Sequence, residues 1–193
     1  ELGIAPDATY EWKAYDSVGN FFKTGHVFSN NVNIRGSSSD GSANYNINYG
    51  NLEDVGFTPG NSVNRNTLSF GGNARLSNNF TVGGTLNFTQ TKFQTPPVAA
   101  SYGSNVGGEG ASVFGNVFYT PRSVDLMGLP WENPKDGSSI YYRQNNSIQN
   151  PRWTVANAAN IQNTNRVFGS TNIQYGLTDN LNVSYRYGVD VYS

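Results

Sequence analysis

The sequence predicts an all-β fold, and three observations lead to that prediction. Six stretches alternate apolar and polar residues with a period of two, which gives an extended strand one apolar and one polar side. No charged residue falls on the apolar side of any of these stretches. Short turns rich in Gly, Asn, Asp and Ser join the stretches in pairs. Together these features indicate antiparallel strands.

The six expected strands follow one another as three pairs. They cover residues 28–35, 43–49, 67–76, 80–89, 167–175 and 181–191. The opposite, polar sides are rich in Asn, Thr, Ser and Arg. The apolar sides carry, in chain order, Phe28, Val32, Ile34, Ala43, Tyr45, Ile47, Tyr49, Leu68, Phe70, Ala74, Leu76, Phe80, Val82, Leu86, Phe88, Val167, Ile173, Tyr175, Leu181, Val183, Tyr185, Tyr187, Val189 and Val191.

The connections alternate between short and long. The strands of each pair are joined by short turns at residues 36–41, 77–79 and 178–180. Between the pairs we expect a medium loop at 50–64 and a very long loop at 94–164. A connection as long as the second one needs a fold of its own, and we expect a short helix at 111–119 and irregular structure at 128–150. Residues 1–25 are expected to form a lead-in segment. The first four expected strands fall within residues 26–93, and the fifth and sixth fall within residues 165–193.

These features favour an antiparallel transmembrane β-barrel segment with residues 94–164 as an extracellular loop. Outer-membrane barrels have short periplasmic turns and long extracellular loops, an apolar outer side and aromatic girdles. Tyr49, Phe80, Phe88 and Tyr175 stand near the ends of the expected strands. The alternative is a soluble or surface-attached glycan-binding β domain, whose polar side is the wet face of a sheet. In the barrel, the lumen-facing residues are Asn31, Asn33, Arg35, Asn46, Asn73, Arg75, Asn87, Asn172 and Arg186.

Composition excludes several functional classes. A net charge of -1 argues against a nucleic-acid binder, which needs a basic excess. The absence of Cys and the single His26 exclude disulfide scaffolds, thiol catalysis and multi-histidine metal sites. The glycine cluster at 107–110 lacks the Lys-Ser/Thr of a phosphate loop. We expect no enzymatic activity and no cofactor; Asp125, Glu132 and Asp136 lack the regular spacing of a calcium loop.

The long loop holds the candidate contact residues. Aromatic rings and Arg beside amides suit a sugar or a peptide, because ring faces supply apolar contact and amides supply hydrogen bonds. The same rings are equally suited to form the small core that a folded loop requires. The residues in question are Trp131, Tyr141, Tyr142, Arg143 and Trp153.

Several segments resemble the start of the barrel in SusC/RagA-like TonB-dependent transporters. They are GNFFKTG at 19–25, NNVNI at 30–34, NYNI at 44–47, DVGF at 54–57, NRNTL at 64–68, TPRSVDL at 120–126 and NPRWT at 150–154. The resemblance covers most of the chain. It implies a barrel of about 22 strands, of which this chain supplies about six. The plug, the segment that contacts TonB and most of the strands are absent from these 193 residues, so we expect a piece of a longer polypeptide.

The resemblance also implies a function. It implies location in the cell outer membrane of a Gram-negative, Bacteroidetes-like bacterium, and TonB-dependent import of glycan or peptide fragments. The expected partners are a SusD-like surface lipoprotein, outer-membrane lipid, the oligosaccharide or peptide substrate, and TonB through a part of the protein outside this chain. The long loop would contribute to the ligand cavity or to the lipoprotein interface.

Overall fold

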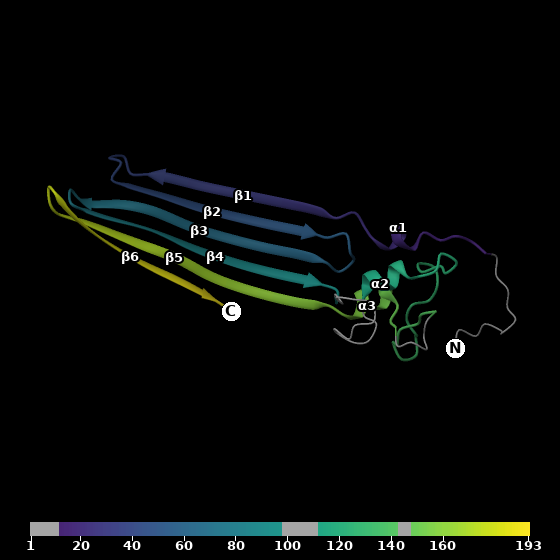
Figure 1. The fold of residues 1–193 in the computed structure, drawn as a ribbon. Coiled ribbons are helices and arrows are strands. Elements are labelled where there is room, and N and C mark those ends of the chain that lie inside the picture. The colour runs from purple at the N-terminus through teal and green to yellow at the C-terminus, as the bar shows by residue number, and fades with distance from the viewer. Residues whose placement is uncertain (1–11, 98–111, 143–147) are drawn as a thin grey trace. The chain divides into compact units, whose positions relative to one another are not determined.

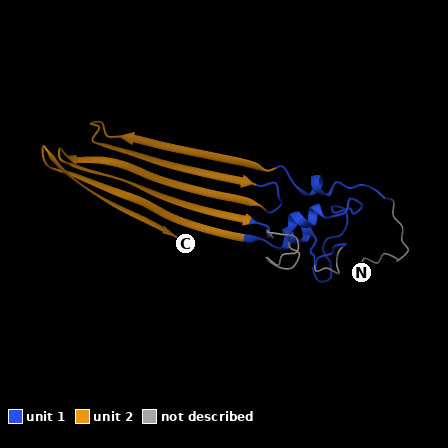
Figure 2. Ribbon diagram, in the orientation of Figure 1, with its two compact units in different colours: residues 1–24, 56–60, 95–160 blue, residues 25–55, 61–94, 161–193 orange. Residues whose placement is uncertain are grey.

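A computed structural model describes residues 12–97, 112–142 and 148–193. The chain divides into two compact units, which are coloured separately in Figure 2. Unit 1 comprises residues 1–24, 56–60 and 95–160, and unit 2 comprises residues 25–55, 61–94 and 161–193. The three helices lie in unit 1, whereas unit 2 consists of strands and their turns.

Unit 2 is a six-stranded sheet in which neighbours along the chain are neighbours in space (Figure 1). The order is β1-β2-β3-β4-β5-β6, and the pairings β1 with β2, β2 with β3, β3 with β4 and β5 with β6 are antiparallel. The chain is thus mostly an antiparallel sheet with few helices, as the alternation predicts. The strands are β1 (His26–Ser37), β2 (Ala43–Val55), β3 (Ser62–Ser77), β4 (Phe80–Thr95), β5 (Asn160–Thr178) and β6 (Leu181–Tyr192).

The strands extend further than the sequence predicts, and most of the added residues lie toward the longer connections. The expected loop at 50–64 is wrong: β2 continues to Val55 and β3 begins at Ser62, which leaves residues 56–61 between them. Likewise β4 ends at Thr95 and β5 begins at Asn160. The prediction ended each strand where apolar residues stop alternating. Backbone hydrogen bonds do not require apolar side chains, so pairing continues through polar residues.

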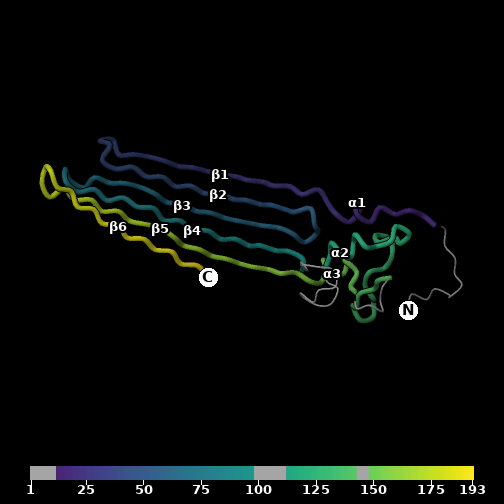
Figure 3. Tube along the Cα trace, in the orientation of Figure 1, coloured from purple at the N-terminus to yellow at the C-terminus, as the bar shows by residue number. Residues whose placement is uncertain are grey.

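The short turns that follow β1, β3 and β5 gather at one end of the sheet, as the trace in Figure 3 shows. In the first turn, the Asp40 carboxylate accepts hydrogen bonds from the Ser38 hydroxyl at 2.6 Å and from the Ser42 amide at 3.0 Å. Gly41 follows with a φ of 68°, a conformation that glycine adopts without strain. Short polar side chains therefore close this turn locally.

Unit 1 is built from three short helices and the segments between them. They are α1 (Ser17–Phe21), α2 (Val113–Phe118) and α3 (Pro151–Asn157), capped by the side chains of Asp16, Ser112 and Asn150. Helix α2 falls within the expected helix at 111–119, whereas α3 was not predicted, although Asn at the N-cap followed by Pro is a helix-start signal. None of the helices in the described ranges is long and apolar enough to cross a membrane.

The small core of unit 1 contains residues of α1, of α2 and of the long connection. Its buried residues are Phe21, Val113, Val117, Leu126 and Tyr141. Phe22, Ile148 and Val155 pack against this core. Backbone hydrogen bonds also tie Tyr15 to Arg122 and Lys23 to Phe57. The lead-in segment and the long connection thus fold together.

The Asp40 turn predicts a pH dependence. Hydrogen bonds from Ser38, and then from Ser42, lower the pKa of Asp40 from 3.8 to about 2. Because the pKa of Asp40 is lower in the folded turn than in the unfolded chain, the ionised carboxylate stabilises the turn. This stabilisation is complete above about pH 4 and is lost as the pH falls toward 2. We expect carbon NMR of the Asp40 carboxyl to titrate near pH 2, and Ser38→Ala to raise this midpoint. Ser37→Ala is the matched control, and an equal rise in both variants would contradict the assignment.

Candidate functional site

The sheet register collects the apolar residues on one face. Paired residues of adjacent strands point to the same side, and Ile34 pairs with Ile47, Ile47 with Phe70, and Phe70 with Leu86. The next row contains Val32, Tyr49, Leu68 and Phe88. In the last pair of strands, Val167 pairs with Val191 and Ile173 with Tyr185. We call this side of the sheet the apolar face.

The apolar face is uncovered in the described structure. Ile34 is 56% exposed, Leu86 48% and Val183 48%, although residues of this type in a protein core are almost completely buried. Leu181, Val189 and Val191 on β6 are also exposed. A face of this extent is typical of a surface that another phase or another molecule covers.

The nine residues that the sequence assigns to a lumen all lie on the opposite side, the polar face. Asn33 pairs with Asn48, Arg35 with Asn46, and Asn172 with Arg186. Asn87 donates a hydrogen bond to the Phe168 carbonyl at 3.4 Å, across the β4-β5 pairing. The remaining three residues of the set occupy positions of the same phase, namely Asn31, Asn73 and Arg75.

The polar face also carries an ion pair that the sequence did not predict. The Arg166 guanidinium donates from Nε to Asp190 Oδ1 at 2.8 Å and lies 4.8 Å from the centroid of the Phe168 ring. Both charged side chains are about half exposed. An exposed pair of this kind contributes little to stability, but it fixes two charges on the polar face beside β5 and β6.

A row of amides limits the apolar face at the end away from the turns. Asn30 pairs with Asn51, Asn51 with Asn66, and Asn66 with Gln90. Gln90 Nε2 donates to Asn165 Oδ1 on β5 at 3.3 Å. We call these five residues the amide row. The sequence missed it because four of its residues, Asn51, Asn66, Gln90 and Asn165, lie in the strand extensions.

The longer strands correct two sequence-based statements. Glu53 and Lys92 lie on the same side as the apolar face, one row beyond the amide row, so that side carries charge at its far end. Tyr49 and Phe88 do not stand at strand ends, because their strands continue to Val55 and Thr95; they stand at the edge of the apolar residues, next to the amide row.

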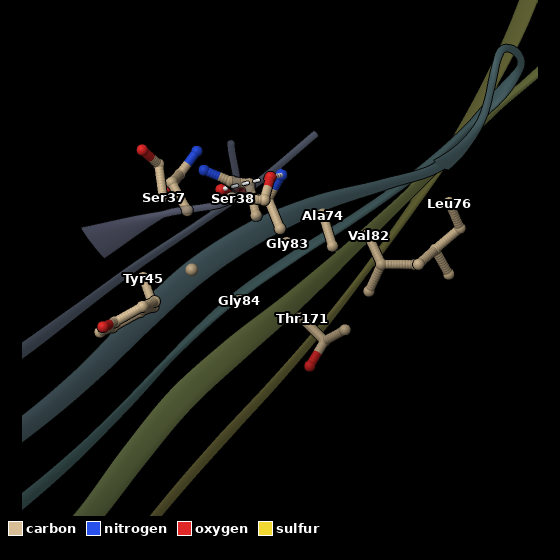
Figure 4. Close-up of a pocket in the computed structure, with 13 residues that line it drawn as sticks. Ser37, Ser38, Tyr45, Ala74, Leu76, Val82, Gly83, Gly84 and Thr171 are labelled. Carbon is tan, nitrogen blue, oxygen red and sulfur yellow. Dashed lines mark hydrogen bonds between the residues drawn. The ribbon is translucent and has the colours of Figure 1, made fainter. Parts of the chain in front are cut away.

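A shallow hollow lies near the turn end of the sheet. It forms where Gly72 and Gly84 pair and leave the sheet without side chains. In Figure 4, Tyr45, Ala74 and Val82 surround this gap. The Tyr45 ring leans over Gly36, where a side chain would collide with it. The hollow is an open surface feature lined mostly by apolar atoms, with Ser37, Ser38 and Thr171 among its lining residues.

In unit 1, Tyr141 is a core residue. It is only 5% exposed, and its hydroxyl lies 2.8 Å from the Thr120 hydroxyl and 2.8 Å from the Asn116 carbonyl oxygen. Burial raises the pKa of Tyr141 well above its usual range. Of the two roles that the sequence left open for Tyr141, its burial favours the core, because its ring and hydroxyl are used inside the folded loop.

Arg152 holds the segment that carries Trp131. Its Nη1 atom donates to the carbonyls of Met127 at 2.7 Å and Leu129 at 3.1 Å, and its guanidinium lies 5.6 Å from the centroid of the Trp131 ring. Burial lowers the pKa of Arg152, and Asp125 opposes that shift. No sequence pattern pointed to Arg152, because its carbonyl partners come from another part of the loop.

The other predicted contact residues differ in accessibility. Tyr142 is 40% exposed, donates from its hydroxyl to the Tyr119 carbonyl at 3.0 Å and stacks edge-on against Tyr141. Trp153 is partly buried and donates from Nε1 to the Gly137 carbonyl at 2.8 Å. Arg143 lies outside the described residues. Trp131, Tyr142 and Trp153 are therefore held in place while keeping part of their rings accessible.

Three described acidic residues of the long connection are used in turns and side-chain contacts. Asp125 accepts from the Gly128 amide at 2.8 Å, Asp136 from the Ser138 amide at 3.0 Å, and Glu132 from Asn157 Nδ2 at 3.1 Å. Among the residues with assigned positions, no cluster of three His, Cys, Asp or Glu could hold a metal ion. The glycine cluster at 107–110 lies outside the described residues.

No protein-family model matches the chain, and no curated protein matches it at a significant level.

The Tyr141 contacts predict a stability effect confined to unit 1. Tyr141→Phe removes a buried hydroxyl that bonds to Thr120 and Asn116, and this costs about 1 kcal/mol of local stability, or about a fivefold faster amide exchange. The loss of local stability is measured as the hydrogen-exchange rate of the Thr120 amide, which donates to the Val117 carbonyl. Tyr142→Phe, at the more exposed neighbour, is the control. Exchange at Thr120 that is unchanged in Tyr141→Phe would show that the hydroxyl is dispensable.

Proposed function

We propose that this chain is part of the wall of an outer-membrane β-barrel in a transporter of the SusC/RagA-like, TonB-dependent kind. The observation that carries the proposal is the uncovered apolar face, which continues across six long strands. The arginines of the sheet stand on the polar face, and Glu53 and Lys92 lie beyond the edge of the apolar residues. Lipid acyl chains are the natural covering for such a face. The polar face then lines the lumen.

The open sheet edges support a larger barrel. Among the described strands, β1 pairs only with β2, and β6 only with β5. A sheet in lipid must close on itself, because unpaired backbone groups are too costly there. Six strands cannot enclose a wide lumen, whereas about 22 strands can. The remaining strands would come from the rest of the transporter.

The height of the apolar face matches a membrane. On β5, the apolar residues run from Val167 to Leu177, and extended backbone spans about 33 Å over that distance. With strands tilted by about 40°, this length corresponds to a band about 25 Å tall, as in known outer-membrane barrels. The turns after β1, β3 and β5 would then face the periplasm.

The function that follows is TonB-dependent import of glycan or peptide fragments, in which no covalent bond changes. The segments at 19–25, 120–126 and 150–154 carry the family resemblance on which the TonB dependence and the SusD-like lipoprotein partner rest. In this proposal unit 1 belongs to the extracellular side, because residues 95–160 connect β4 to β5 at the strand ends that do not carry the short turns. Trp131, Tyr142 and Trp153 are its candidate contacts with a ligand or with the lipoprotein.

A matched pair of substitutions on β4 tests the membrane orientation. Leu86 lies on the apolar face opposite Phe70, and Asn87 lies on the polar face opposite Ser69. Leu86→Arg places a charge in lipid and costs about 2 to 4 kcal/mol of barrel stability near the bilayer midplane, while Asn87→Arg costs much less. Urea unfolding of the full-length transporter in lipid vesicles measures both values.

Two results would count against the proposal. Equal costs at Leu86 and Asn87 would remove the distinction between a lipid side and a lumen side. A wild-type protein that stays monomeric in water without detergent would favour the alternative, a soluble or surface-attached glycan-binding β domain, because an uncovered apolar face should aggregate there.

The contact role of unit 1 is tested at Tyr142. If this ring is a true contact, Tyr142→Ala weakens binding of the ligand or the lipoprotein by about 2 kcal/mol, or about 30-fold in Kd. Tyr142→Phe keeps the ring and serves as the control. The affinity is measured on full-length protein whose thermal unfolding is unchanged. An unaltered Kd for both partners in Tyr142→Ala would rule out Tyr142 as a contact.

A further inference from the structure

The amide row marks a change of environment that is shared by neighbouring strands. On the apolar side of four strands, the residues turn from Val32, Tyr49, Leu68 and Phe88 to Asn30, Asn51, Asn66 and Gln90 at the same row. On β5, Val167 gives way to Asn165, which contacts Gln90. A change at one strand has many explanations. At a tilt of about 40° neighbouring strands differ by only about 3 Å in depth, so the same change on neighbouring strands indicates a boundary in what surrounds the sheet.

The amides of this row are organised by hydrogen bonds. Asn66 Oδ1 accepts from Asn51 Nδ2 and from the Tyr49 hydroxyl, both at 2.9 Å, and Asn66 Nδ2 donates to Asn64 at 3.3 Å. The Tyr49 ring therefore lies among apolar residues while its hydroxyl reaches the amide row. A tyrosine in this position is typical of an interface between an apolar phase and a polar one.

Beyond the amide row the same side becomes charged. Glu53, Asn64 and Lys92 form the next row in β2, β3 and β4, and Phe28 of β1 pairs with Glu53 in the same row. On β2, β3 and β4, three successive rows thus present apolar side chains with aromatic rings, then neutral amides, then Glu53, Asn64 and Lys92, whereas on β1 the third row is Phe28. This order of polarity matches the order of chemical groups from acyl chains to phosphate-bearing headgroups in a lipid layer.

We propose that the amide row and the Glu53-Asn64-Lys92 row bind lipid headgroups, the amides bonding to ester and phosphate oxygens and the Lys92 ammonium pairing with phosphate. This inference rests on the proposed membrane placement and adds where the membrane ends on the sheet. The continuity of both rows with the apolar face favours lipid over a protein partner, which would leave the adjoining apolar rows without a covering.

Residues of a single strand give the sharpest test, because strand tilt shifts the membrane level from one strand to the next. Leu86 and Gln90 lie on the same side of β4, four residues apart. That spacing corresponds to about 13 Å along the strand and about 10 Å in membrane depth. Phe70 and Asn66 on β3 form an equivalent pair.

The experiment uses full-length transporter in phosphatidylcholine vesicles, with single cysteines carrying an environment-sensitive fluorophore. The variants are Leu86→Cys, Gln90→Cys and Asn87→Cys, with Phe70→Cys and Asn66→Cys as a repeat should one variant fail to fold. Quenching by lipids brominated in the acyl chain is compared with quenching by headgroup-attached nitroxide. We expect the headgroup-to-acyl quenching ratio to be at least about twofold higher at Gln90 than at Leu86, given the depth difference of about 10 Å.

Each outcome separates the two proposals. If Leu86 and Gln90 show the same quenching ratio, and acyl bromine quenches both more strongly than the headgroup probe does, the headgroup assignment is overturned. The barrel proposal then still stands. Quenching of Gln90 by neither lipid probe, with Leu86 quenched by acyl bromine, would also overturn it and point to a protein covering. Quenching of neither position would contradict the proposed function itself. Asn87, on the polar face, should respond to neither lipid probe.

Discussion

The sheet depends on one geometric constraint, which is that paired residues of adjacent strands point to the same face. The register is constant through nearly the whole of each described pairing. A shift of one residue would move the apolar side chains of that strand among the Asn and Arg side chains of the polar face. The described shifts, at Arg75/Ser77 and Gly176/Thr178, lie next to turns, so the phase is kept along the remaining strand.

The same constraint allows strands far apart in the sequence to join one sheet. Strands β4 and β5 meet after the long connection, and Gly169 lies so close to Thr85 and Leu86 that a side chain there would collide with the β4 backbone. Gly84 similarly approaches Ser170. Close backbone approach at these glycines keeps β5 in phase, so the apolar face continues from β4 to β5.

Unit 1 solves a different problem, because its core has few apolar residues. Buried polar groups complete it: Thr154 is fully buried, Asn150 caps α3, and the Tyr141 and Thr120 hydroxyls meet at the Asn116 carbonyl. Buried groups of this kind stabilise only when they are paired, and these are. Arg152 adds bonds to backbone carbonyls and a contact with Trp131, which explains why an aromatic-rich segment with little regular structure has a defined conformation.

The sequence by itself determined the six strands, their two faces, the tight turns and the short helix α2, because period-two alternation and turn residues are local signals. The tertiary structure alone decided the rest. Polar residues pair through their backbone as well as apolar ones, so the ends of β2 and β3 left no trace in the alternation. The residues of the amide row come together only because the pairing register aligns them across strands. Tyr141 and Arg152 take their roles from hydrogen-bond partners that are remote in the chain. Such contacts have no sequence period, so the assignment of Tyr141 to a core or a contact had to come from its burial.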